Sequence, residues 1–118
     1  MLSSKRKRMI AYLDSIERQQ WSPFEVLLDH CMSDQLFDTI AQIGVTGISC
    51  HIDFLDDYKC INIQGRYKSY YVDLQIEQEE FSIGCDSVEP DEHKVFILES
   101  PEYLYSIIDA EIKALSDN

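Results

Sequence analysis

The amino-acid sequence predicts a single α+β domain over residues 1–118, with N-terminal helices, a mainly antiparallel five-stranded sheet and a C-terminal helix. Apolar and polar residues alternate with period two between Gly47 and Cys85, as in strands with one buried and one solvated face. Helix-start signals stand on both sides of this stretch, at Ser22 and at Ser100. We therefore expect the helices to pack on one face of the sheet, leaving the opposite face exposed.

The first expected helix begins at Ser3 or Ser4 and pairs Asp14 with Arg18 across one turn. One stripe of this helix holds Met9, Leu13, Ile16 and Gln20. Its first turn contains the basic cluster Lys5–Arg8, where cations meet the positive end of the helix dipole. Residues 1–8 are therefore expected to fray.

The next helical segment has a strong start signal. Ser22 suits the N-cap, Pro23 the first helical position, and Glu25 completes a capping box. Ser33 is expected to cap a further turn and a half that ends at Gly44. The sequence leaves open whether residues 22–43 form one bent helix or two.

Four strands are expected near residues 46–54, 59–65, 69–77 and 80–85. Gly65-Arg66 is expected to form a tight turn, whereas the connection at Glu79-Glu80 contains no glycine. A polar loop over residues 86–92 follows. A fifth strand over residues 94–98 is a nearly unbroken apolar run, so it is expected near the centre of the sheet or covered on both faces.

The last expected helix starts at Ser100, with Pro101 at the first position and Glu102 in the first turn. Asp109 is expected to pair with Lys113 on the solvated side. The apolar stripe of this helix consists of Leu104, Ile107, Ile108, Ile112 and Leu115.

Acidity is the unusual property of the composition. Ten basic residues against 22 acidic ones give a net charge of −12, and four of the basic residues form the Lys5–Arg8 cluster. Such a surface repels phosphate backbones, which argues against nucleic acid as a direct ligand, and it attracts basic proteins. The simpler alternative is that the acidity only keeps the protein soluble.

The four cysteines lack the paired spacing of metal or redox motifs, and three of them lie in the strand region. Buried free thiols in a reducing compartment explain them better than disulfides do. Cys60 has the strand parity of an exposed residue, so it is the best candidate for an accessible thiol. Neither a secretory signal nor a membrane-spanning segment is expected, which favours a cytoplasmic location.

No catalytic motif emerges from the sequence. His51 and Asp53 lie two apart on an expected strand and point from the same face, as a metal site or acid–base pair needs. Two ordinary polar residues on a solvated sheet face give the same pattern. Asp56 and Asp57 lack the glycine and glutamate spacing of a calcium loop. We expect neither enzymatic activity nor a metal or cofactor.

The solvated sheet face and the adjoining loop are the predicted partner-binding surface. Tyrosine among carboxylates is suited to recognising arginine and lysine on a basic protein. The expected function is neutralisation of such a partner, as by an immunity or inhibitor protein against a toxin or nucleic-acid enzyme. A secretion-type chaperone, an enzyme and a small-ligand domain are the alternatives. The candidate contact residues are His51, Asp53, Asp56, Asp57, Tyr71, Asp73, Gln75 and Glu77.

Overall fold

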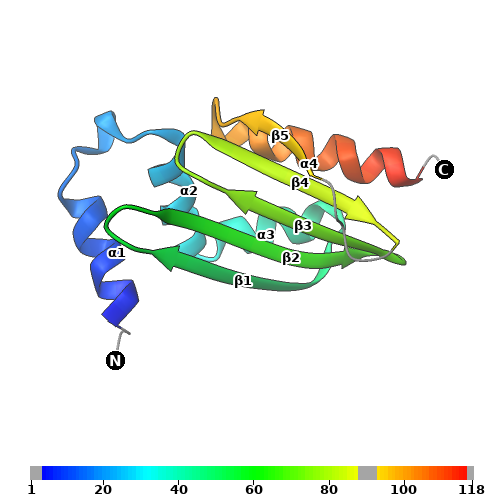
Figure 1. Ribbon diagram of the computed structural model, residues 1–118, viewed down its shortest axis with the longest axis horizontal. Coiled ribbons are helices and arrows are strands. Elements are labelled where there is room, and N and C mark those ends of the chain that lie inside the picture. The colour runs from blue at the N-terminus through cyan, green and yellow to red at the C-terminus, as the bar shows by residue number, and fades with distance from the viewer. Residues whose placement is uncertain (1–3, 88–92, 117–118) are drawn as a thin grey trace.

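The computed structural model describes residues 4–87 and 93–116 and confirms the α+β fold. The strands form an antiparallel meander in the order β1-β2-β3-β4-β5, so each strand lies beside its neighbours in the chain. Figure 1 shows this sheet in front of α2, α3 and α4, with its other face uncovered. The elements are α1 (Ser4–Asp14), the 3₁₀ turn η1 (Arg18–Gln20), α2 (Pro23–Met32), α3 (Gln35–Ile43), β1 (Thr46–Phe54), β2 (Lys59–Tyr67), β3 (Tyr70–Ile76), β4 (Glu80–Asp86), β5 (Lys94–Ile97) and α4 (Pro101–Ser116).

Two helix starts match their sequence signals. The Ser22 backbone N–H donates to Glu25 Oε1 over 3.0 Å, and the Ser22 hydroxyl donates to the same oxygen over 2.9 Å. At α4, the Tyr103 backbone N–H donates to Ser100 Oγ over 3.0 Å. Because the two backbone N–H groups have no carbonyl partner within the helix, their bonds to side chains fix where each helix begins.

Residues 22–43 form two helices, and the break lies one residue later than expected. Ser33 ends α2, with its N–H bonded to Asp29 O, so its predicted role as a cap for α3 is wrong. Asp34 precedes α3 with a φ of 64°. Aspartate tolerates this left-handed conformation better than most residues do, which lets the chain turn sharply between the helices.

Helix α1 is shorter than its apolar stripe suggested. It ends at Asp14, so the predicted pair with Arg18 is wrong; Arg18 instead contacts Asp29 of α2 at 3.4 Å. Met9 and Leu13 are buried as expected, whereas Gln20 is exposed. The Lys5 ammonium donates to Ile52 O on β1 over 2.6 Å. Ser3 lies outside the described residues, and the fraying of the first turn stays a prediction.

The turn predicted at Gly65-Arg66 is wrong, because β2 continues to Tyr67 and the chain reverses at residues 68–69. Gly65 is needed for close packing instead. A Cβ there would lie 2.5 Å from Val45 Cγ1 and 3.0 Å from Thr46 O. The next hairpin turns at residues 78–79, where the Glu77 N–H donates to Glu80 O over 2.8 Å.

Gly65→Ala should therefore destabilise the protein by about 1–3 kcal/mol, because the new methyl group forces Val45 and the β1 backbone apart. Urea-induced unfolding measures this change. The Gly65→Ala/Val45→Ala double variant should lose less stability than the sum of the losses of the two single variants. The reason is that the second change removes the nearest clashing atom. Strict additivity would show that the Val45 contact is not the cause.

The expectation that the fifth strand is central or covered on both faces is wrong, since β5 is an edge strand. Its apolar side chains have two different environments. Phe96 packs on Phe81 with ring centroids 5.3 Å apart, whereas Val95 is 61% and Ile97 72% exposed on the other side. Part of the predicted polar loop before β5, residues 88–92, lies outside the described residues.

Most of the buried hydrophobic side chains form one cluster between the helices and the inner face of the sheet. Within the described part of the chain, no helix has the length and apolar character needed to cross a membrane. The cluster consists of Met9, Leu13, Phe24, Leu27, Leu28, Cys31, Leu36, Ile40, Val45, Phe54, Ile61, Ile63, Val72, Leu74, Ile76, Phe81, Ile83, Leu98, Leu104, Ile108 and Ile112.

Candidate partner-binding face

The open face is the side of the sheet that no helix covers. Strand register places side chains on it in rows that run across neighbouring strands, with His51 opposite Asn62, Asn62 opposite Gln75, and Gln75 opposite Ser82. The alternation predicted from the sequence therefore has the correct parity. The open face consists of Ser49, His51, Asp53, Cys60, Asn62, Gln64, Arg66, Tyr71, Asp73, Gln75, Glu77, Glu80, Ser82, Val95 and Ile97.

Several predicted contact residues are exposed on this face or beside it. His51 Nε2 lies 3.1 Å from Asp53 Oδ1, and both side chains are exposed. Asp56 and Asp57 are exposed in the loop between β1 and β2, and Gln75 is exposed on β3. A pair that is open to solvent gains little from its own attraction, so these groups can exchange partners at low cost.

At the other end of β3, Tyr71 contacts Arg66. The Arg66 guanidinium lies 4.4 Å from the centre of the Tyr71 ring and also donates a hydrogen bond to the Tyr71 hydroxyl. The Arg66 cation thus already covers the Tyr71 ring, which was expected to contact a basic partner. Tyr71 is therefore less suited to a basic partner than its sequence context suggested.

Asp73 has a structural role. It is only 17% exposed, and it accepts hydrogen bonds from His93 Nε2 over 2.8 Å and from Asn62 Nδ2 over 3.0 Å. Gly84, its partner in the register on β4, has no side chain to separate Asp73 from His93. Asp73 therefore connects β3 to the residue that precedes β5. Both of its carboxylate oxygens already accept hydrogen bonds within the protein, so they are not available to a partner.

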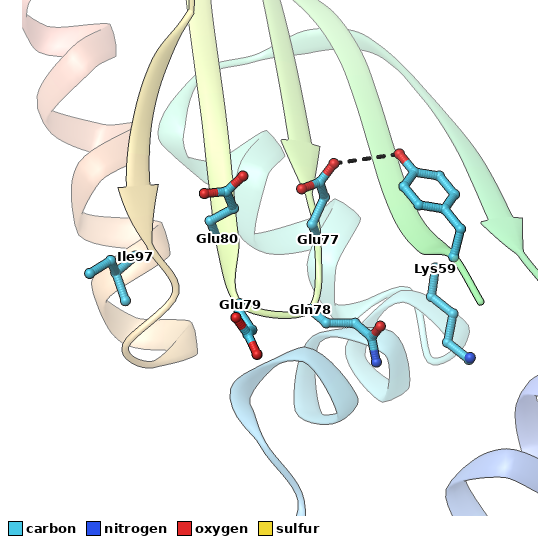
Figure 2. Close-up of a pocket in the computed structure, with 7 residues that line it drawn as sticks. Lys59, Glu77, Gln78, Glu79, Glu80 and Ile97 are labelled. Carbon is cyan, nitrogen blue, oxygen red and sulfur yellow. Dashed lines mark hydrogen bonds between the residues drawn. The ribbon is translucent and has the colours of Figure 1, made fainter. Parts of the chain in front are cut away.

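Acidic groups gather where the β1–β2 and β3–β4 hairpins turn. We call this the acidic end of the open face; it consists of Asp53, Asp56, Asp57, Glu77, Glu79 and Glu80. The Tyr58 hydroxyl donates to Glu77 Oε1 over 3.5 Å. Figure 2 shows Glu77 and Glu80 side by side. They border a groove of about 540 Å³ lined by Tyr58, Lys59, Glu77, Gln78, Glu79, Glu80 and Ile97.

The sequence missed part of this groove. In the sequence, Glu79 and Glu80 stand at an expected connection between two strands, and nothing marks Tyr58 as a binding residue. Assigning Ile97 to the groove requires knowledge of the strand order. Nothing in the local sequence places β5 beside β4 with Ile97 opposite Glu80. The sequence signal that could have placed Ile97 on the open face is alternation of apolar and polar residues along β5. That alternation cannot be recognised, because the strand is a nearly unbroken apolar run.

Cys60 is not the accessible thiol that its parity suggested, since it is only 5% exposed. It points to the open face beside the Tyr58 phenol, and this neighbouring thiol raises the pKa of Tyr58 to about 12. Burial raises the pKa of the Cys60 thiol. A raised pKa lowers the thiolate fraction, so Cys60 is a poor nucleophile.

Stability should decrease in alkaline solution. Burial raises the pKa of Cys85 from 9.0 to about 11, and the neighbouring Cys60 thiol raises that of Tyr58 from 10.0 to about 12. The unfolded chain thus loses these protons first, and their contribution to stability, complete below pH 9, disappears as the pH rises through 11 and 12. Urea midpoints measured with reductant from pH 8 upwards should fall less steeply for Cys85→Ala and for Tyr58→Phe. A flat wild-type profile would contradict this expectation.

Among residues 4–87 and 93–116, no three His, Cys, Asp or Glu side chains come together in an arrangement that could hold a metal ion. Comparison of the chain with known proteins finds no matching family model, curated protein or solved structure.

Proposed function

We propose that this chain is a small acidic binding module that neutralises a basic protein partner through the acidic end of its open face. The partner class is a toxin or nucleic-acid enzyme with a basic active cleft, which makes the chain an immunity or inhibitor protein. The observation that carries the proposal is the groove in which Glu77 and Glu80 lie between the Tyr58 ring and Ile97.

The groove has the chemistry to hold an arginine or lysine side chain. Its carboxylates supply acceptors for charge-assisted hydrogen bonds, and arginine can bridge two neighbouring carboxylates with its planar fork. Tyr58 (42% exposed) and Ile97 supply apolar area beside these acceptors. Aromatic and aliphatic contacts around a central charge are typical of the strongest positions in protein interfaces.

The charge of the whole chain supports the same partner class. A net charge of −12 attracts a basic surface over long distances, and such attraction accelerates association. The Lys5–Arg8 cluster lies on α1, where Lys5 contacts β1, and so does not neutralise the groove. A cytoplasmic location stays a prediction.

The test is a pull-down of partners by the tagged chain at about 0.05 M and about 0.5 M salt, because added salt shortens the screening length to roughly 4 Å. We expect one stoichiometric basic protein whose association rate falls steeply between the two salt concentrations. Capture of no partner at either concentration would indicate that the acidity serves solubility only.

A secretion-type chaperone is the second candidate, and β5 is the observation that favours it. Such proteins bind extended segments along apolar surface, and β5 offers an edge strand with Val95 and Ile97 exposed beside it. Edge strands can pair with an added strand. These chaperones are dimers, so a monomeric mass by light scattering would argue against this candidate.

A further inference from the structure

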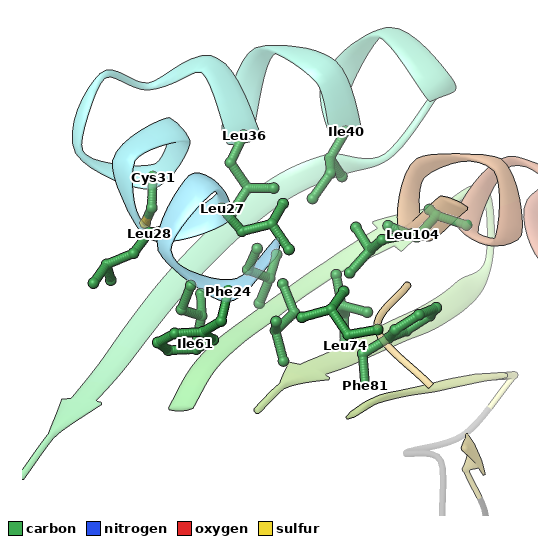
Figure 3. Close-up of a cluster of buried hydrophobic side chains, with 14 of the residues drawn as sticks. Phe24, Leu27, Leu28, Cys31, Leu36, Ile40, Ile61, Leu74, Phe81 and Leu104 are labelled. Atoms are coloured by element: carbon green, nitrogen blue, oxygen red, sulfur yellow. The ribbon is translucent and has the colours of Figure 1, made fainter. Parts of the chain in front are cut away.

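Two free cysteines from distant parts of the sequence meet under the sheet. Cys31 lies at the C-terminal end of α2, and Cys50 lies in the middle of β1; their sulfur atoms are 3.6 Å apart. Figure 3 shows Cys31 on α2 as one of the residues of the buried cluster. A disulfide needs a sulfur separation of about 2.0 Å, so the two atoms must approach by roughly 1.6 Å.

We propose that Cys31 and Cys50 form a reversible disulfide when the protein meets a peroxide, and that this bond fastens α2 to the edge strand β1. The inference concerns the opposite side of the sheet from the partner-binding groove and does not rest on the proposed function. Cys60 and Cys85 are free thiols of the same chain and serve as internal references.

The two sulfurs are not equivalent. The hydrogen bond between the two sulfurs lowers the pKa of Cys50, and the same bond together with burial raises the pKa of Cys31. Cys50 is also the more exposed of the two. Because the thiolate is the nucleophile, Cys50 reacts first and Cys31 resolves the product.

Solvent reaches Cys31 of this pair from the edge of the sheet. A cleft of about 190 Å³ lies between α1, α2 and β1 and is lined by Lys5, Arg6, Met9, Cys31, Met32 and Ile52. Hydrogen peroxide is little larger than water, so a cleft of this size admits it.

The chemistry balances in two steps. The Cys50 thiolate attacks one peroxide oxygen, so that an S–O bond forms, the O–O bond breaks, and hydroxide leaves and is protonated to water. The Cys31 sulfur then attacks the Cys50 sulfur, forming the S–S bond and breaking the S–O bond. The departing hydroxide takes the Cys31 proton, so two thiols and one hydrogen peroxide give one disulfide and two water molecules.

The bond would close a loop over residues 31–50 that contains α3 and the first half of β1. Closing such a loop restricts the unfolded chain, so oxidation should raise Tm by roughly 5–10 °C. Dithiothreitol should reverse the shift. Hydrogen exchange in α3 should also slow, because opening of that helix no longer frees its ends.

The experiment treats the reduced full-length chain with hydrogen peroxide, blocks the remaining thiols under denaturing conditions and maps the cross-link by mass spectrometry. Trypsin leaves both cysteines in one peptide between Arg18 and Lys59, so cleavage at Asp34 or Asp38 is needed to separate them. We expect a loss of about two mass units and a Cys31–Cys50 cross-link, with the other two thiols blocked.

Variants sharpen the result. Cys31→Ser and Cys50→Ser should each abolish the mass loss and the Tm shift, whereas Cys60→Ser and Cys85→Ser should retain both. A cross-link to Cys60 or Cys85, an intermolecular product, or oxidation of Cys50 to sulfinic acid without cross-linking would overturn the proposal. Mapping on the unsubstituted chain decides the question even where a variant fails to fold.

Discussion

Replacing Glu77 and Glu80 together by lysine should weaken binding of the basic partner by about 100-fold, because like charges then face each other at close contact. Both carboxylates border the groove, and Glu80 is exposed. The association rate should fall, because long-range attraction is weaker. The dissociation rate should also rise, because contacts within an interface act mainly on dissociation. Surface plasmon resonance against the partner recovered in the pull-down measures both rates.

The matched control is Asp38→Lys with Glu102→Lys. Both residues are exposed on helices α3 and α4, away from the open face, and the change in net charge is the same as for the groove variant. Long-range attraction therefore falls equally in the two variants, and only the groove variant loses contacts. Equal weakening by both would show that total charge, and not this face, determines binding.

Phe24→Ala should destabilise the protein by about 3–5 kcal/mol, because it removes a fully buried ring and leaves a cavity. Phe24 lies in the first turn of α2, within the cluster that joins this helix to the sheet, and Figure 3 draws it there with Ile61 and Leu74. A small domain has a total stability of about 5–15 kcal/mol, so the variant should be partly unfolded near 37 °C. Urea unfolding followed by circular dichroism measures the loss.

Ile97→Ala is the control for this variant. Ile97 is 72% exposed on β5, so its truncation should change stability by less than about 0.5 kcal/mol. The same variant tests binding, because Ile97 lines the groove. A Phe24→Ala protein as stable as the Ile97→Ala protein would mean that α2 does not pack on the sheet as described.

The fold was predictable from the sequence because its signals are local. Alternation over residues 47–85 has period two wherever one face is buried, so it fixes the parity of each strand before any strand order is known. The caps at Ser22 and Ser100 act within one helical turn and were identified correctly. The helix breaks were less visible, because the left-handed Asp34 resembles an ordinary polar residue in sequence.

The candidate site was only half predictable, for a physical reason. Acidic residues such as Glu77 and Asp53 could be assigned to one face from the sequence. Whether each carboxylate is available to bind a partner depends on what it contacts on neighbouring strands. Asp73 is occupied by His93, which lies 20 residues away, and Tyr71 is occupied by Arg66. The Asp73–His93 contact depends on register and on the missing side chain of Gly84, which no short window of sequence displays.

By itself, the sequence determined the fold class, the parity of the strands, two helix starts and the excess of acid. Only the tertiary structure decided that β5 lies at the edge of the sheet and that carboxylates gather at the acidic end of the open face. It also decided that Gly65 packs against Val45 and that Cys31 meets Cys50. Local patterns report which way a side chain points. Its neighbours come from segments distant in the chain, and only packing brings those segments together.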